Sequence, residues 1–213
     1  MQVLLTGPIE GHLQKFYTEA AKQSPHWIVC SGSYGAYPDP HRMSRAAKHH
    51  AGTDFSRAYV GALILPTIPS LFVAGVHEDH RFLQERVKAN NTEVLANVHY
   101  LAQGYRTTIG FEKPLRVTGL GKVYSESTWK GELNKRSSRH YTRNEIERGC
   151  SSGPTDLLVV YESLDAPGIR NLIYATRPKL ILTSKHPNQT VYSNVQGIPV
   201  VSLSRQETKL IEI

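Results

Sequence analysis

Short apolar runs alternate with polar and helix-like stretches along the chain, and they predict a sheet-based fold. Residues 2–6 (QVLLT) and 27–31 (WIVCS) are continuously apolar or nearly so, as expected of strands buried on both faces. Between these two runs, apolar residues recur at helical spacing at Leu13, Phe16, Tyr17 and Ala20. A strand, a helix and a strand in this order indicate parallel strands joined by a crossover helix.

The same pattern continues to the end of the sequence. It predicts helices over 43–59, 77–90 and 166–178, and buried strands at 71–74, 155–162 and 179–184. Residues 98–123 form short apolar runs divided by Gly and Pro, which favours an antiparallel meander, and the tail ends in further strands. We therefore expect one α/β domain over residues 1–213, built as a two-sheet αββα sandwich with the helices outside.

Charge changes the picture by suggesting a polyanionic partner. The 213 residues include 25 Lys and Arg against 18 Asp and Glu, for a formal net charge of +7. Basic residues crowd two segments, although a solvated basic loop has the same composition. The candidates for contact with nucleic acid are Arg42, Arg45, Lys48, Lys130, Lys135, Arg136, Arg139 and Arg143.

Targeting signals and cysteine usage suggest where the protein works. No apolar run approaches the roughly 20 residues that span a bilayer, and the N-terminal run breaks at Gly7-Pro8. Only Cys30 and Cys150 are present, without zinc-ligand spacing. We expect an intracellular protein, cytoplasmic, nuclear or virus-encoded, that is not secreted and has no membrane partner.

Five predicted strands end in loops rich in polar and small residues: TGPIEGH, SGSYG, AGVHED, YESLDAPG and TSKHPN. Because ligands of α/β sheets gather at the carboxyl ends of the strands, these loops are expected to meet at one pocket. The third loop, with His77, Glu78, Asp79 and His80, has the residue types of a metal site. Glu78 and Asp79 are, however, also expected wherever a helix begins.

The order of these loops resembles the calcineurin-like metallophosphoesterases. That family has Asp-x-His, Gly-Asp, Gly-Asn-His-Asp/Glu, a lone His and Gly-His-x-His after successive strands. The resemblance covers nearly the whole chain, and GPIEGHLQKFYT, SLFVAGVHEDHRFLQ, VHYLAQGYR, VTGLGKVYSESTWKG and RHYTRNEIE are most similar to RNA lariat-debranching enzymes and related splicing-associated proteins. The resemblance implies the two-sheet fold and favours RNA over DNA as a partner.

The chain departs from the family at most ligand positions. Pro8 stands in place of the first Asp and Glu10 in place of its His, Ser33 replaces the metal-bridging Asp, and His77 alone stays in register. The remaining positions of this degenerate site are Val76, Tyr161, Lys185 and His186.

These departures argue against a two-metal centre, because two nearby divalent ions repel and need anionic bridging ligands. We expect no metal cofactor and no catalytic residue, with His77 as the residual catalytic candidate. The alternative is one divalent ion, Mn, Zn or Fe, on Glu10, His77 and His186. The adjacent pair His49-His50 points in divergent directions on a helix and is interpreted as a solvated face.

Three functions remain open from the sequence. The first is an inactive metallophosphoesterase-like domain that binds RNA or a ribonucleoprotein, with Lys185 and the loop amides of Gly7, Gly11 and Gly32 holding phosphate. The second is a pure protein scaffold, for which the apolar segment 61–69 would supply an exposed patch. The third is a metal-dependent phosphodiesterase of nuclease or debranching type with a rearranged site.

Overall fold

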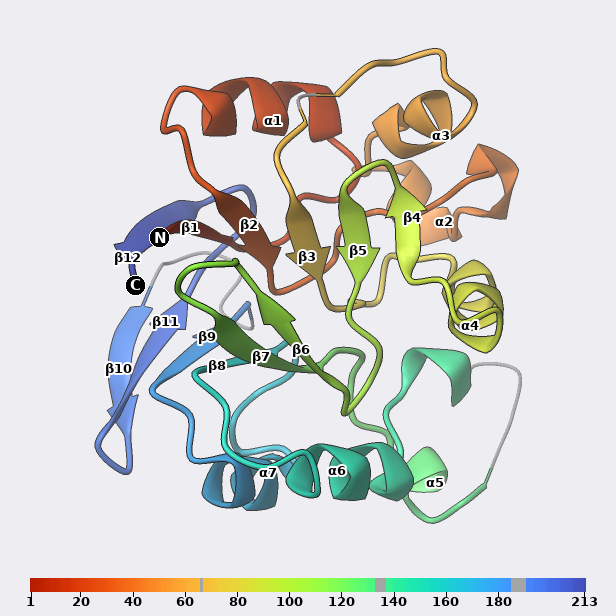
Figure 1. Cartoon of the computed structure of the whole chain (residues 1–213). Helices are drawn as coiled ribbons and strands as arrows, with labels where there is room; N and C mark the ends of the chain where they lie inside the picture. The colour runs from red at the N-terminus through yellow and green to blue at the C-terminus, as the bar shows by residue number, and fades with distance from the viewer. Residues whose placement is uncertain (66, 133–136, 185–190) are drawn as a thin grey trace.

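The computed structural model describes all residues except 66, 133–136 and 185–190, and it contains two six-stranded sheets that face each other (Figure 1). The first sheet has the order β12 (Thr208–Glu212), β1 (Gln2–Thr6), β2 (Trp27–Cys30), β3 (Ser70–Phe72), β5 (Val98–Tyr100), β4 (Glu93–Leu95). The second has the order β10 (Val191–Val195), β11 (Ile198–Ser202), β9 (Leu180–Thr183), β8 (Leu157–Val160), β7 (Leu115–Leu120), β6 (Arg106–Ile109).

Each sheet has four parallel strands at its centre and an antiparallel strand at each edge. In the first sheet β1, β2, β3 and β5 are parallel, and β12 and β4 run the other way. In the second sheet β7, β8, β9 and β11 are parallel, and β6 and β10 are antiparallel. The central strands are buried on both faces, which explains their continuous apolar sequences.

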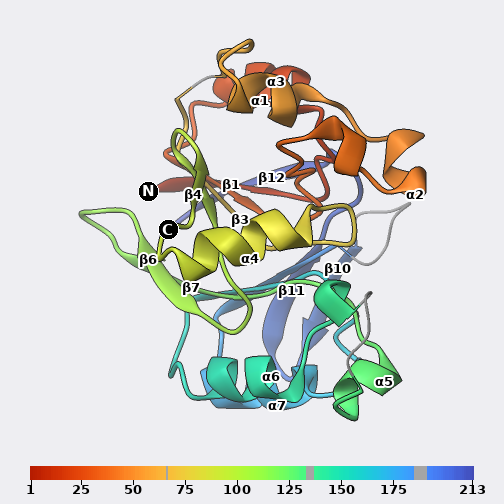
Figure 2. The same ribbon diagram turned by 90° about the vertical axis from the view of Figure 1, so that its right-hand side faces the viewer.

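Helices cover the outer faces of both sheets. Figure 1 and Figure 2 show α1 (Leu13–Ala21) and α3 (Asp54–Tyr59) on the outside of the first sheet, and α6 (Arg143–Cys150) and α7 (Ile169–Thr176) on the outside of the second. The apolar face predicted from helical spacing, Leu13 to Ala20, packs with Leu4 and Ile28 of the first sheet. Helix α4 (His80–Lys88) lies along the side of the sandwich (Figure 2).

The core between the sheets consists of aliphatic side chains from both inner faces. Val3, Leu5 and Val29 of the first sheet pack with Val117 and Val159 of the second in one buried cluster. Burying such side chains contributes about 1.5–3 kcal/mol each relative to exposure, so the two sheets are held mainly by this layer. The predicted two-sheet α/β sandwich is confirmed.

Two expectations about local structure are wrong. Residues 98–123 form no antiparallel meander, because β5 joins the first sheet parallel to β3 while β6 and β7 form a hairpin in the second. The expected helix over 43–59 is two short helices, α2 (Arg45–Lys48) and α3, which are separated by residues 49–53. Gly52 lies against the backbone of Gly11 in this break, where a side chain would collide.

The segment between α3 and β3 is both a connector and a surface. Leu65 and Ile68 pack against the outer core of the first sheet, whereas the side chain of Ile64 is 91% exposed. None of the helices in the described residues is long and apolar enough to cross a membrane.

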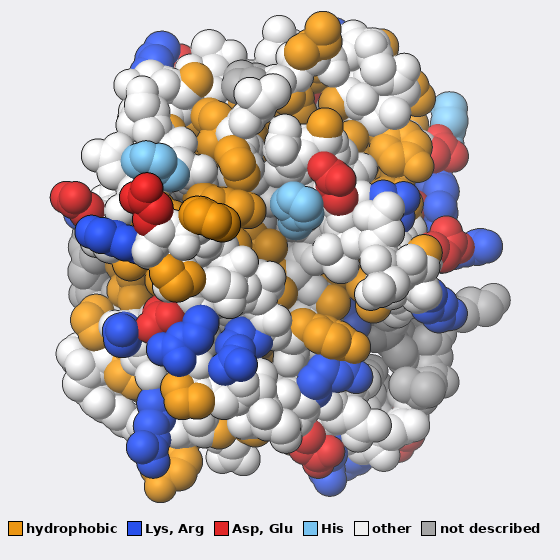
Figure 3. All heavy atoms as spheres, in the orientation of Figure 1, with side chains coloured by type: hydrophobic (Ala, Val, Ile, Leu, Met, Phe, Trp, Pro, Cys, Tyr) orange, Lys and Arg blue, Asp and Glu red, His pale blue; other side chains and the backbone are white. Residues whose placement is uncertain are grey.

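A basic patch surrounds the amino ends of the central strands in the second sheet, and Lys and Arg side chains gather over that half of the molecule in Figure 3. Asp156 pairs with Arg116 at 2.9 Å and with Lys179 at 3.0 Å, and Arg106 donates to Pro154 O at 3.1 Å. The Arg116 guanidinium holds the pKa of Asp156 well below its usual range. We refer to Arg106, Arg116, Arg177 and Lys179 as the amino-end patch.

Candidate functional site

The loops after β1, β2, β3 and β8 meet at the carboxyl-end face of the sandwich, as the sequence predicts. The amides of Ile9 and Glu10 both donate to Ser33 O at 2.9 Å, and the amide of His77 donates to Ser33 Oγ at 3.1 Å. Tyr161 hydrogen-bonds Ser33 as well. Ser33 is therefore the residue that joins these loops. Lys185 and His186, in the loop after β9, lie outside the described residues.

Three potential metal ligands gather beside this junction. One ligand atom from each of Glu10, His50 and His77 lies within 4.8 Å of the other two. His50 Nε2 is 3.7 Å from Glu10 Oε2, and the His50 and His77 rings meet edge to face with centroids 4.7 Å apart. The structure thus places Glu10 and His77 together, as the single-metal alternative requires, with His50 as a further neighbour.

His50 is the site residue that the sequence interpretation misses. His50 lies in the segment between α2 and α3, which is attached to the loop after β1. His12 Nε2 lies 2.9 Å from His50 O, and Gly52 N donates to Glu10 O at 2.8 Å. Its neighbour His49 is exposed, so the expected solvated face holds for only one of the pair. Gly52 is the available signal, since a glycine two residues after a histidine pair argues against a continuous helix.

Glu78 is buried, and both of its carboxylate oxygens accept hydrogen bonds from backbone amides. Its carboxylate accepts the amides of Tyr34 at 2.6 Å, Gly35 at 3.0 Å and Ala36 at 2.6 Å, and lies 3.5 Å from the amide of Gly75. Burial raises the pKa of Glu78 to about 7, and these amide hydrogen bonds oppose the rise. Glu78 therefore shapes the loop after β2 and has no oxygen free for a ligand.

Asp79 behaves as the helix-start interpretation expects. Its Oδ1 accepts the amide of Phe82 at 3.1 Å and caps α4, while its Oδ2 pairs with Arg42 at 2.8 Å. His80 follows as the first residue of α4 and is buried. Burial, with help from the charges of Lys122, Arg139 and His140, lowers the pKa of His80 to about 3.

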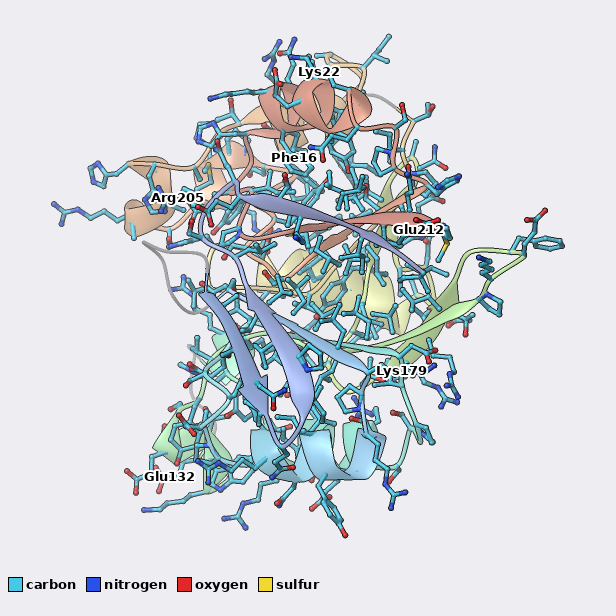
Figure 4. All side chains as sticks on the ribbon, turned by 90° about the vertical axis from the view of Figure 1, so that its left-hand side faces the viewer. Phe16, Lys22, Glu132, Lys179, Arg205 and Glu212 are labelled. Atoms are coloured by element: carbon cyan, nitrogen blue, oxygen red, sulfur yellow. The ribbon has the colours of Figure 1, made fainter. Side chains whose placement is uncertain are left out.

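His77 is held in its neutral form. Burial is the main cause that lowers its pKa to about 4, and the charges of His50, Arg139 and Arg205 act in the same direction. Arg205, on the loop between β11 and β12, also lies 2.7 Å from Glu10 Oε2 through its Nε. In Figure 4, Arg205 lies on the same side of the molecule as Glu132 and opposite Lys179.

The described residues do not fit a two-metal centre. Pro8 and Val76 have no donor atom, Ser33 is occupied by the His77 amide, and Tyr161 is buried beside it. The two remaining carboxylates in the loop after β3 are engaged by backbone amides and by Arg42. Among the described residues Glu10 is then the one carboxylate that could reach an ion here, and Arg205 already pairs with it. One carboxylate is too little negative charge to hold two cations that repel each other strongly.

The expectation that loop amides hold a phosphate is wrong for the three glycines named. The amide of Gly7 donates to Glu207 O at 3.1 Å, that of Gly11 to Tyr34 O at 2.8 Å, and that of Gly32 to Cys30 Sγ at 3.3 Å. Because the protein itself satisfies these three donors, they are not available to an anion.

The predicted basic residues separate into groups. Arg42, on the turn before α2, and Arg139, at the end of η2 (Ser137–Arg139), both approach the loop after β3. Arg45 and Lys48 are exposed on α2. Lys130 instead pairs with Glu126 at 2.6 Å on α5 (Glu126–Trp129), and Arg143 stacks 5.2 Å from the centroid of Trp129. Lys135 and Arg136 lie outside the described residues.

Comparison with known proteins identifies the fold. No family model matches the chain, and no curated protein matches it in sequence. The chain is similar to the crystal structure of TT1561 of Thermus thermophilus, with a TM-score of 0.61 and 16% identity over 98% of this chain and 97% of that one. A second solved chain matches with a TM-score of 0.60 and 13% identity, over 99% and 98%. These likenesses show the two-sheet α/β fold over nearly the whole chain.

Proposed function

We propose that this protein is a metallophosphoesterase-like domain without a two-metal hydrolytic centre, which binds RNA at the carboxyl-end face of its sheets. The observation that carries the proposal is the meeting of three basic segments at one loop. Arg42, Arg139 and Arg205 come from distant parts of the sequence, and all approach residues 77–80 or their neighbour Glu10.

The charge balance of this face favours an anionic ligand. Its acidic groups are already neutralised, because Glu10 pairs with Arg205, Asp79 pairs with Arg42, and Glu78 is buried under amides. Arg139 adds positive charge beside His77 and His80: burial is the main cause that lowers the pKa of both imidazoles, and the charge of Arg139 acts in the same direction. The same pairs also offset the charges of Arg42 and Arg205, so the net positive charge offered to a phosphate diester comes from Arg139 and from Arg45 and Lys48 on α2.

The shape of the face suits an extended strand. Figure 2 shows α2 and α5 on the same side of the molecule, where the parallel strands end, with one beside each sheet. Arg45 and Lys48 on α2 are exposed next to this site. Guanidinium and ammonium groups spread over both sheets can follow several successive phosphates of a single strand.

Replacing Arg45, Lys48 and Arg139 together by Gln tests the proposal. If each contacts one phosphate, the variant should bind single-stranded RNA at least about tenfold more weakly at low salt, and the slope of log affinity against log salt should fall by about 2. Fluorescence anisotropy with a labelled oligonucleotide at several salt concentrations measures both quantities.

The matched control carries the same change of charge on the amino-end patch, with Arg106, Arg177 and Lys179 replaced by Gln. It should bind RNA nearly as well as the unaltered protein. Equal losses in the two variants would mean non-specific attraction, and no RNA binding at low salt would leave the protein scaffold as the function. Metal-stimulated hydrolysis of a phosphodiester that disappears in His77→Ala would establish the phosphodiesterase instead.

A further inference from the structure

Glu10, His50 and His77 form a cluster in which each imidazole has a buried ring nitrogen without a hydrogen-bond partner among the described residues. Glu10 Oε2, His50 Nε2 and His77 Nδ1 are all buried and make no hydrogen bond to the described residues. Glu10 itself is 5% exposed, and within that part of the chain the only partner at Oε2 besides His50 is the ion pair with Arg205. The two imidazole nitrogens, buried without a partner beside this carboxylate, are costly unless something binds between them.

From this arrangement we propose that Glu10, His50 and His77 bind a single zinc-like divalent transition ion. Two imidazoles and one carboxylate are a donor set that zinc uses with a fourth position left open. Ligands about 2.1 Å from a tetrahedral ion lie roughly 3.4 Å from one another. The 3.7 Å between His50 Nε2 and Glu10 Oε2 is close to that spacing.

The three ligands come from segments whose backbones are already fixed to one another. Glu10 is in a left-handed conformation with φ of 53°, and its amide donates to Ser33 O. The amide of His77 donates to the side chain of the same serine. The segment of His50 is attached to the loop after β1 through Gly52 N to Glu10 O at 2.8 Å. Such fixed positions reduce the entropy that an ion must overcome to gather its ligands.

This site differs from the two-metal centre of the family that the sequence resembles. His50 belongs to the segment between β2 and β3, which contributes no ligand motif in that family, and Ser33 takes no part. The inference also does not require RNA binding, because none of Arg45, Lys48 and Arg139 belongs to the ligand set. Failure of one proposal therefore leaves the other intact.

Arg205 makes metal binding at this site adjustable. Its guanidinium competes with any cation for the Glu10 carboxylate, since Nε lies 2.7 Å from Oε2. Arg205→Gln should therefore strengthen metal binding by removing a like charge from the site. If the cluster holds an anion instead, the same substitution should weaken uptake of inorganic phosphate and leave metal binding absent.

Cobalt titration of the purified, metal-stripped full chain tests the inference, because Co²⁺ substitutes for zinc and its visible absorption reports the number of ligands. We expect one Co²⁺ per chain with the intense visible bands of a four-coordinate ion. Glu10→Gln, His50→Gln and His77→Gln should each weaken binding by about 100-fold or more, as expected when one of three ligands is lost. His49→Gln, at the exposed neighbouring position, should bind Co²⁺ as the unaltered protein does.

The result is interpretable even if a ligand variant folds poorly. Arg205 is half-exposed and outside the sheets, so Arg205→Gln should fold normally and bind Co²⁺ more tightly. Absence of a cobalt spectrum, retention of it in all three ligand variants, or weaker binding in Arg205→Gln would each overturn the inference. Equilibrium dialysis against Zn²⁺ gives the stoichiometry without relying on the spectrum.

Discussion

Glu78→Ala is expected to lower the free energy of unfolding by about 3–5 kcal/mol, the largest stability effect of any single substitution suggested by the site. The substitution leaves the amides of Tyr34, Gly35 and Ala36 buried without an acceptor and opens a cavity under the loop after β2. Urea unfolding of the variant and the unaltered protein measures the difference.

The matched control for Glu78→Ala is Glu85→Ala. Glu85 lies on α4, the helix that follows Glu78, but its side chain is exposed and pairs with Arg81. That variant should lose less than about 0.5 kcal/mol. Amide hydrogen exchange adds a local measurement, because protection at residues 34–36 should fall in Glu78→Ala alone. A loss below about 1 kcal/mol in Glu78→Ala, with protection kept, would contradict the role given to this carboxylate.

His80 is expected to make the protein sensitive to acid. The folded state holds its pKa at about 3, against 6.5 for a free imidazole. Between these values the unfolded chain binds a proton that the folded chain excludes, so stability is lost as the pH falls through this window. The loss attributable to His80 should approach about 1.4 kcal/mol per pH unit and total about 4–5 kcal/mol at the acid end.

His80→Gln isolates this contribution, because the variant has no imidazole to titrate. Free energies of unfolding measured between about pH 7 and about pH 4 should fall less steeply in the variant than in the unaltered protein. His49→Gln, which removes an exposed imidazole, should leave the slope unchanged. Parallel slopes for His80→Gln and the unaltered protein would show that His80 has the same pKa in the folded and unfolded states.

Much of the fold can be predicted from the sequence, because parallel strands that are buried on both faces consist of continuous apolar residues. Residues 2–6 and 27–31 are predicted as strands on that basis, and they form β1 and β2. The pattern reveals a strand but not its neighbour, so it cannot place β5 in the first sheet and β6 in the second. That choice depends on packing between segments far apart in the chain.

The candidate site is predictable only where loops follow strands. Glu10, Ser33 and His77 lie soon after β1, β2 and β3, so topology brings them together. His50 and Arg205 lie in irregular segments, whose course is set by contacts such as that between Gly11 and Gly52. The role of Glu78 also cannot be predicted from the sequence, because its hydrogen-bond partners are backbone amides, which every residue except proline has.

The pairing of β1 with β12 has a consequence for how this molecule forms. Leu4 lies opposite Leu210, so the first sheet is complete only when the two ends of the described fold have met. During synthesis the edge of β1 that pairs with β12 stays unpaired until residues 208–212 have left the ribosome. Such non-local pairing slows folding and leaves an apolar edge open to other chains. We expect aggregation to be most severe for chains interrupted before Thr208.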